Sequence, residues 1–201
     1  MTHADRIRLF AGAACAALTL AVAPTGRAGP ASMAASPVVL TATEAQAVTG
    51  FETRLKEYMA LHNKLEGTLK AVPKKATPEQ IEQNQRALSA LLKTARAGAQ
   101  QGDFFTPGMQ TLVSRVLASA MAGPGGSRSK DSIMDDNVGL PEIRVNERYP
   151  DALPLTTMPL LVLQTLPKLD DGLEYRFVGH RLILMDAHAC MIMDFTENVL
   201  P

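Results

Sequence analysis

The sequence predicts an α+β protein in which an N-terminal amphipathic helical hairpin or three-helix unit precedes a Pro-rich arm and a small three-stranded antiparallel meander. Three features of the sequence support this class. Apolar residues recur at spacings of three and four over residues 43–122, as on one face of a helix. A Gly-rich stretch, 123–140, interrupts this pattern. Beyond Gly172, within residues 141–201, apolar residues alternate with a period of two, which is typical of strands.

The first 28 residues have the order of a secretory signal peptide. Arg6 and Arg8 precede an uncharged, mostly apolar run over residues 9–23, and small residues lead to a predicted cleavage after Ala28. The run has about 15 residues, fewer than the roughly 20 that a membrane-spanning helix needs. We therefore expect an exported protein, periplasmic or extracellular after cleavage, with no transmembrane segment in its mature chain. Two alternatives are a lipoprotein cleavage box at residues 12–15 and an uncleaved anchor.

A leader and a first helix follow this segment. Residues 29–42 are rich in Ala, Pro and Ser and are expected to form a flexible leader. The first helix is predicted from about residue 43 to Leu69, since Pro73 prevents its continuation. Its apolar face consists of Val48, Phe51, Leu55, Tyr58, His62, Leu65 and Leu69. Within that face we interpret His62 as a boundary histidine with satisfied hydrogen bonds, and a ligand or switch role is the alternative.

Capping signals define the second and third helices. Thr77-Pro78 supplies an N-cap hydroxyl and a proline at the first helical position, and Gln80 stands three residues after the cap, as in a capping box. Thr106-Pro107 begins the third helix in the same way. Three amphipathic helices joined by short loops predict the helical unit over residues 43–122. Residues 123–140 are polar and Gly-rich, and we expect a disordered linker there because they bury little apolar surface.

An extended arm and a short helix are expected after the linker. Residues 141–157 are predicted to run extended along a surface, because proline restricts the backbone of the residue before it. The prolines of this region are Pro141, Pro150, Pro154, Pro159 and Pro167. Residues 159–166 are apolar nearly all round and are predicted to make two helical turns.

The meander is predicted from alternation and from turn residues. Gly179-His180 suits a tight hairpin turn with Gly first. That turn pairs the apolar residues of the first two strands into one patch, Tyr175 with Leu184 and Phe177 with Leu182. The third strand, over about residues 190–195, has two alternative registers. Either Ile192 joins the patch, or Met191, Met193 and Phe195 do.

The strands of this meander carry a resemblance. Residues 174–179, 182–186 and 191–195 read EYRFVG, LILMD and MIMDF, and they resemble a β-hairpin module of short secreted bacterial proteins without assigned function. They are also similar to the C-terminal hairpin of periplasmic nickel/cobalt homeostasis proteins of the RcnB type. At most, this resemblance implies an envelope protein with a link to metal handling, and it carries over no catalytic residue.

Candidate metal ligands gather near the second turn of the meander. Asp186, His188 and Cys190 stand at alternate positions, and on a regular strand they would share a face. Their side chains are of the types that bind Zn, Ni, Co or Cu, and no other cofactor is expected. The competing interpretations are a turn-forming Asp186, a solvated His188 and a lone Cys190 that is buried, reactive or paired between molecules. His180 lies at the other turn, so a complete site would need a ligand from elsewhere in the chain.

The sequence points to a binding role without catalysis. It contains no P-loop, GxSxG, HExxH or paired CxxC motif, and its formal net charge of zero gives no reason to expect nucleic acid. We predict a non-catalytic binding or structural module of the bacterial cell envelope that binds an envelope protein or a second copy of itself. The expected interaction surface is apolar and comprises Leu160, Leu161, Leu163, Phe177, Ile183 and Met185. The alternatives are periplasmic transition-metal binding or homeostasis through the His188/Cys190 turn and, third, an apolar ligand held between the helices.

Overall fold

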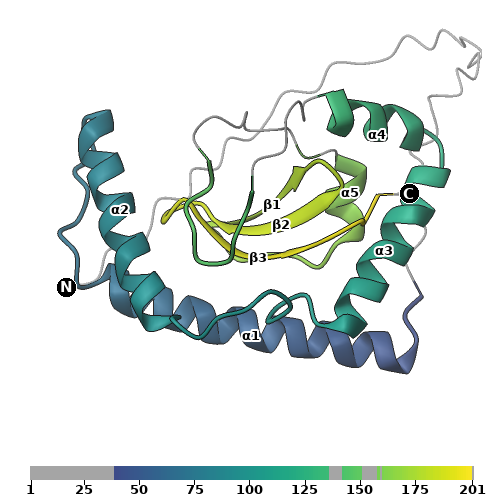
Figure 1. Ribbon diagram of the computed structural model, residues 1–201, viewed down its shortest axis with the longest axis horizontal. Coiled ribbons are helices and arrows are strands. Elements are labelled where there is room, and N and C mark those ends of the chain that lie inside the picture. Colours follow the sequence, from purple (N-terminus) through teal and green to yellow (C-terminus); the bar gives the residue numbers. More distant parts are fainter. Residues whose placement is uncertain (1–38, 136–141, 151–157, 159, 201) are drawn as a thin grey trace, which may run out of the picture. The chain divides into compact units, whose positions relative to one another are not determined.

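The computed structural model describes residues 39–135, 142–150, 158 and 160–200, and within them it contains five helices and one three-stranded antiparallel sheet (Figure 1). This confirms the predicted α+β class. The elements are α1 (Ala42–Glu66), α2 (Pro78–Ala95), α3 (Pro107–Ala122), α4 (Gly126–Asp135), α5 (Leu160–Thr165), β1 (Leu173–Val178), β2 (Arg181–Asp186) and β3 (Met191–Thr196). The predicted signal peptide, residues 1–28, and residues 29–38 of the leader lie outside the described residues, and the leader's last residue, Ala42, begins α1.

The helix starts follow the local chemistry. α2 begins with the predicted capping box, in which Thr77 and Gln80 each accept a hydrogen bond from the other residue's backbone N–H. α3 begins at Pro107 as predicted, although the Thr106 side chain makes no capping hydrogen bond. α1 ends at Glu66, short of the predicted Leu69, because Gly67, a poor helix former, follows it.

The predicted disordered linker is wrong for residues 126–135, which form α4. This helix is amphipathic in spite of its polar composition. Ile133 is buried and Met134 is partly buried, and both pack against the main hydrophobic cluster. These two apolar side chains attach the segment to the core, and α4 packs beside α3. Residues 136–140 lie outside the described part of the chain.

The sheet has the strand order β1-β2-β3, and its first hairpin has the predicted register. Tyr175 pairs with Leu184 and Phe177 with Leu182, and Gly179 takes the positive φ of 60° that the turn requires. In β3 neither predicted alternative holds completely. Met191 and Met193 belong to the cluster that contains this patch, whereas Ile192 and Phe195 belong to the cluster on the other face.

A β-bulge explains this division of β3. Leu184 pairs with Asp194 and Met185 with Ile192, so Met193 is an extra residue in the third strand. The extra residue shifts the alternation by one position. As a result Asp194 lies where it accepts backbone hydrogen bonds from the loop of residues 102–105 that precedes α3.

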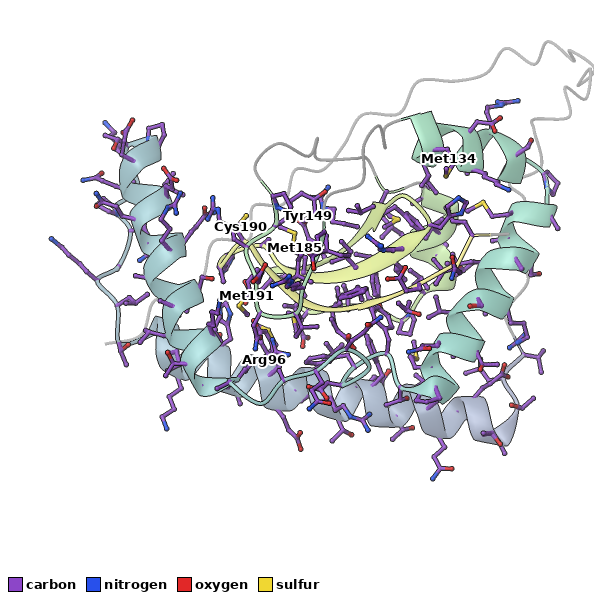
Figure 2. The ribbon with its side chains drawn as sticks, in the orientation of Figure 1. Arg96, Met134, Tyr149, Met185, Cys190 and Met191 are labelled. Carbon is purple, nitrogen blue, oxygen red and sulfur yellow. The ribbon has the colours of Figure 1, made fainter. Side chains whose placement is uncertain are left out.

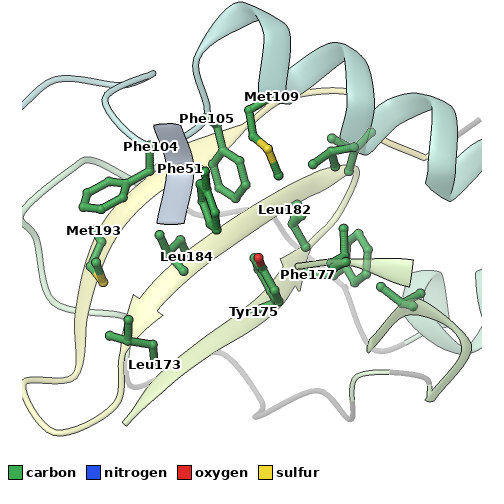
Figure 3. Close-up of a cluster of buried hydrophobic side chains, with 14 of the residues drawn as sticks. Phe51, Phe104, Phe105, Met109, Leu173, Tyr175, Phe177, Leu182, Leu184 and Met193 are labelled. Carbon is green, nitrogen blue, oxygen red and sulfur yellow. The ribbon is translucent and has the colours of Figure 1, made fainter. Parts of the chain in front are cut away.

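The helical unit and the meander share one core. Phe51 of α1 and Phe105 stack with ring centroids 6.0 Å apart. Figure 3 shows both rings, with Met109, packed over the strands. The buried cluster joins residues of α1, α2 and α3 with residues of all three strands. The two halves therefore dock on each other through this core.

The opposite face of the sheet is covered by the arm. The N–H groups of Asn146 and Tyr149 donate to carbonyl groups of β3 and of the turn before it, and the Ile192 N–H donates back to Glu147. Residues 142–150 thus lie beside β3, as the predicted arm should, but the chain turns at residues 145–146, where Asn146 has a φ of +64°, instead of running fully extended. Residues 151–157 are not described. Figure 2 shows Tyr149 and Met185 close together on this side.

The arm corrects part of the predicted interaction surface. Phe177, Ile183 and Met185 are all at most 4% exposed, because the helices cover the first and the arm covers the other two. They therefore offer no surface to a partner. Leu160 and Leu163 of α5 are exposed, and the side chain of Leu161 lies outside the described atoms.

Candidate metal centre

The last turn of α1 meets the turn between β2 and β3. His62 and Glu66 are four residues apart on α1 and therefore project from the same face of the helix. His188 lies in the turn of residues 187–190. Among the described residues, these three form the only group of three or more His, Cys, Asp or Glu side chains whose donor atoms all lie within 4.8 Å of one another.

The distances within this group bring each histidine close to Glu66. His62 Nε2 lies 3.4 Å from Glu66 Oε2, and His188 Nδ1 lies 3.4 Å from Glu66 Oε1. These separations are longer than an ordinary hydrogen bond of about 2.9–3.0 Å. Ligands about 2.0–2.1 Å from a tetrahedral Zn²⁺ are about 3.3–3.4 Å from one another. The two 3.4 Å distances end on different oxygens of Glu66, so they show that each histidine nitrogen lies within reach of an ion bound to this carboxylate and do not define a coordination geometry.

A buried carboxylate orients His62 from behind. Asp186 is fully buried, and its Oδ2 lies 2.6 Å from His62 Nδ1 and accepts a 2.6 Å hydrogen bond from the Tyr58 hydroxyl. Its Oδ1 accepts a 2.9 Å hydrogen bond from the Ala189 N–H. Since a carboxylate only accepts, Nδ1 carries the proton of the neutral imidazole and Nε2 presents its lone pair toward Glu66. Metal-binding histidines are typically held by such a carboxylate.

The electrostatics of the pair show that Asp186 carries the negative charge that holds His62. Burial raises the pKa of Asp186, but the hydrogen bonds from His62, Tyr58 and the Ala189 N–H outweigh it, and the pKa falls below its usual value. The hydrogen bond to Asp186 raises the pKa of His62 in spite of burial. Burial and the charge of Asp186 raise the pKa of Tyr58, which stays a neutral donor. Asp186 is therefore ionised at neutral pH.

Arg96 supports the outer side of this network. Its guanidinium lies 5.3 Å from the centre of the Tyr58 ring and 5.5 Å from that of Phe104. It also donates to the side chain of Asn146 and to the carbonyl of Met193 (labelled Arg96 in Figure 2). Arg96, which follows α2, thus contacts both the arm and β3. Its guanidinium lies over the π-face of the Tyr58 ring and helps to hold that ring in place.

Gly172 supports the His188 side. Its carbonyl accepts the Ala187 N–H at 2.8 Å, which ties the start of β1 to the turn. Its φ is +86°, and a Cβ there would lie 3.4 Å from the Cε1 and Nε2 atoms of His188. The backbone of Gly172 thus packs against one side of the imidazole, while Nδ1 on the ring's other side faces Glu66.

The ligand set differs from the one that alternation predicted. Asp186 lies behind His62, and Cys190, at a φ of +51°, packs against the cluster on the other face of the sheet. Of the predicted set, only His188 belongs to the group that the structure brings together. The predicted convergence required a regular strand, and the turn at 187–190 interrupts it.

Glu66 was not predicted as a ligand, and for His62 a ligand role was only the alternative. His62 was interpreted as a boundary histidine, and it does have a hydrogen-bond partner, but its second nitrogen faces the group. Glu66 was one of several charged residues in the first helix. The i, i+4 spacing of His62 and Glu66 was the one local signal that could have paired them.

Comparison of the chain with family models, with curated proteins and with solved structures finds no significant match. The resemblance to nickel/cobalt homeostasis proteins therefore stays a prediction. In the described part of the chain, no helix combines the length and the apolar composition that crossing a membrane requires.

Proposed function

We propose that this protein binds one divalent transition metal ion, with Zn²⁺ as the expected ion, through His62, Glu66 and His188, and that binding rather than catalysis is its role. The observation that carries the proposal is the hydrogen bond between Asp186 and His62 Nδ1. Because Nδ1 is bound to Asp186, the other nitrogen, Nε2, is the one that faces Glu66, and Glu66 in turn faces His188. The predicted export would place this site in the periplasm or outside the cell.

The donor types select the class of ion. Two imidazoles and one carboxylate are typical of Zn²⁺ sites and also suit Ni²⁺, Co²⁺ and Cu²⁺. Mg²⁺ and Ca²⁺ prefer sites made of oxygen donors alone.

The test is metal retention by the full chain after dialysis against Zn²⁺, Ni²⁺, Co²⁺ and Cu²⁺, with metal measured by mass spectrometry. We expect about one Zn²⁺ per chain and its loss in His188→Ala. His180→Ala is the matched control, because His180 is an exposed histidine in the other hairpin turn and should leave retention unchanged.

Cys190→Ser separates the two ligand sets. The proposed site predicts that this variant retains Zn²⁺ and that Glu66→Gln does not. The opposite pattern would restore the set Asp186, His188 and Cys190. A wild-type chain that retains no metal would reject both sets.

Partner binding is the second candidate function, favoured by the exposure of α5. Leu160 and Leu163 are 68% and 49% exposed on one short helix. Association with an envelope protein or with a second copy would cover them. If the chain self-associates, Leu163→Ser should lower its mass in sedimentation equilibrium. A wild-type chain that is monomeric and retrieves no envelope protein after crosslinking would count against this function.

A further inference from the structure

Of the three proposed ligands, His62 is buried, whereas Glu66 and His188 are exposed to solvent. The side chain of His62 is 2% exposed, whereas those of Glu66 and His188 are 41% and 54% exposed. A metal ion held by all three would face protein on the His62 side and solvent on the opposite side. An incoming ligand could therefore reach the ion directly from solvent.

The neighbouring polar groups have other partners. Both carboxylate oxygens of Asp186 accept hydrogen bonds, from two side chains of α1 and from a backbone N–H of the turn. Cys190 packs against the cluster on the other face of the sheet. Across the residues that the structure describes, the donor group thus has three members. A zinc site closed by protein alone has four ligands, and one that exchanges ligands has three and an open position.

From this geometry we infer that the metal centre keeps one coordination position for an exchangeable external ligand, and that this ligand is a neutral nitrogen donor of the imidazole type. The inference rests on the proposed metal binding at His62, Glu66 and His188. It adds that the centre recognises a second molecule through the ion itself.

The local charge decides the type of external ligand. The two positive charges of the ion are offset by the carboxylate of Glu66, a direct ligand, and by that of Asp186, one hydrogen bond behind His62. Arg96 adds a positive charge near Asp186, but this charge also interacts with Asp194 and Asp103. The centre is then close to neutral, so an anion gains little from it. A neutral nitrogen donor leaves this balance unchanged and is of the same ligand class as the two histidines.

The experiment uses the full chain loaded with Co²⁺, whose visible absorption reports the ligands around the ion. Imidazole is titrated into one sample and azide into another, and retained Co²⁺ is measured at the end of each titration. We expect a saturable change with imidazole, without loss of Co²⁺, and a weaker response to azide. His180→Ala should respond like wild type.

Each other outcome has a definite meaning. Retained Co²⁺ with a spectrum that imidazole does not alter would show a closed site and overturn the inference, while the proposed metal binding would stand. Tighter binding of azide than of imidazole would overturn the neutral-donor assignment. A spectrum that changes with protein concentration alone would show that the fourth ligand comes from a second copy of the chain. That result would overturn the inference of an external small-molecule ligand. A chain that takes up no Co²⁺ would overturn both proposals.

Discussion

Replacing Asp186 with Asn tests the link between the buried network and the metal centre. The side-chain amide has one acceptor, whereas the Asp186 carboxylate accepts from Tyr58, His62 and the Ala189 N–H. If the amide oxygen faces Ala189, the NH₂ group faces His62 Nδ1, which must then accept. The proton of the imidazole moves to Nε2, and the atom proposed to bind metal becomes a donor. In the reverse orientation the NH₂ group faces the Ala189 N–H, so two donors oppose each other and the N–H loses its acceptor.

Both orientations lead to weaker metal binding. Loss of a carboxylate behind a histidine ligand typically lowers metal affinity by about 10–100-fold, or about 1.4–2.7 kcal/mol. The metal-free chain should also lose about 1–3 kcal/mol of unfolding free energy, because a buried donor loses its acceptor. Zn²⁺ affinity is measured by competition with a chromophoric chelator, and stability by urea unfolding of the metal-free protein.

Tyr58→Phe is the matched control for Asp186→Asn. It removes one hydrogen bond to the same carboxylate oxygen but leaves the tautomer of His62 unchanged. We expect a loss of about 1 kcal/mol in stability and a smaller change in affinity than Asp186→Asn causes. A folded Asp186→Asn variant that binds Zn²⁺ within about twofold of wild type would refute the idea that Asp186 orients the ligand.

Three further predictions concern the framework of the site. Asp194→Ala should lower the unfolding free energy by about 2–4 kcal/mol in urea titrations, because backbone N–H groups of residues 102–105 lose their acceptor. Phe105→Ala, at a fully buried position, should cost about 3–5 kcal/mol in the same assay. The hydrogen bond from Arg115 and that from the N-cap backbone lower the pKa of Glu44 from 4.5 to about 2. Because the folded-state pKa lies below the unfolded one, this stabilisation is complete above about pH 4.5 and is lost as the pH falls toward 2. Glu44→Gln should remove that part of the acid sensitivity, and NMR titration of the carboxyl group should give the low pKa directly.

Features that depend on neighbouring residues could be predicted from the sequence. The capping box of Thr77 and Gln80 is decided within four positions. The turn at Gly179 fixed the pairing of Tyr175 with Leu184, since a two-residue hairpin turn leaves one register. The polar composition of α4 does not predict a helix, because composition alone does not reveal that Ile133 is buried.

The register of β3 could not be read from its own residues. Four of the six side chains of Met191–Thr196 are apolar and three of these are consecutive, so alternation gives no preference between faces. What identifies the register is the charged residue, Asp194. Its carboxylate must find donors, and the N–H groups of residues 102–105 provide them about 90 positions away. Only the folded chain brings that loop and the bulge together.

The candidate site, like the register of β3, depends on residues that only the folded chain brings together. A triple variant tests what its buried polar residues contribute. A buried polar pair adds little stability beyond an apolar pair of similar volume, while removal of one partner is costly. Asp186→Leu alone leaves the donors of Tyr58 and His62 unsatisfied. Tyr58→Phe/His62→Leu/Asp186→Leu removes those donors too and leaves only the Ala189 N–H without its acceptor.

We therefore expect the free energy of unfolding of the triple variant to exceed that of Asp186→Leu by about 1–3 kcal/mol. The triple variant should nevertheless retain no Zn²⁺. Urea unfolding of the metal-free proteins and metal analysis after dialysis measure the two properties separately. A triple variant less stable than Asp186→Leu would mean that the network acts mainly as a structural link between α1 and the sheet. Regained stability without metal would mean instead that these buried polar groups serve to orient Nε2 of His62 toward Glu66 and His188.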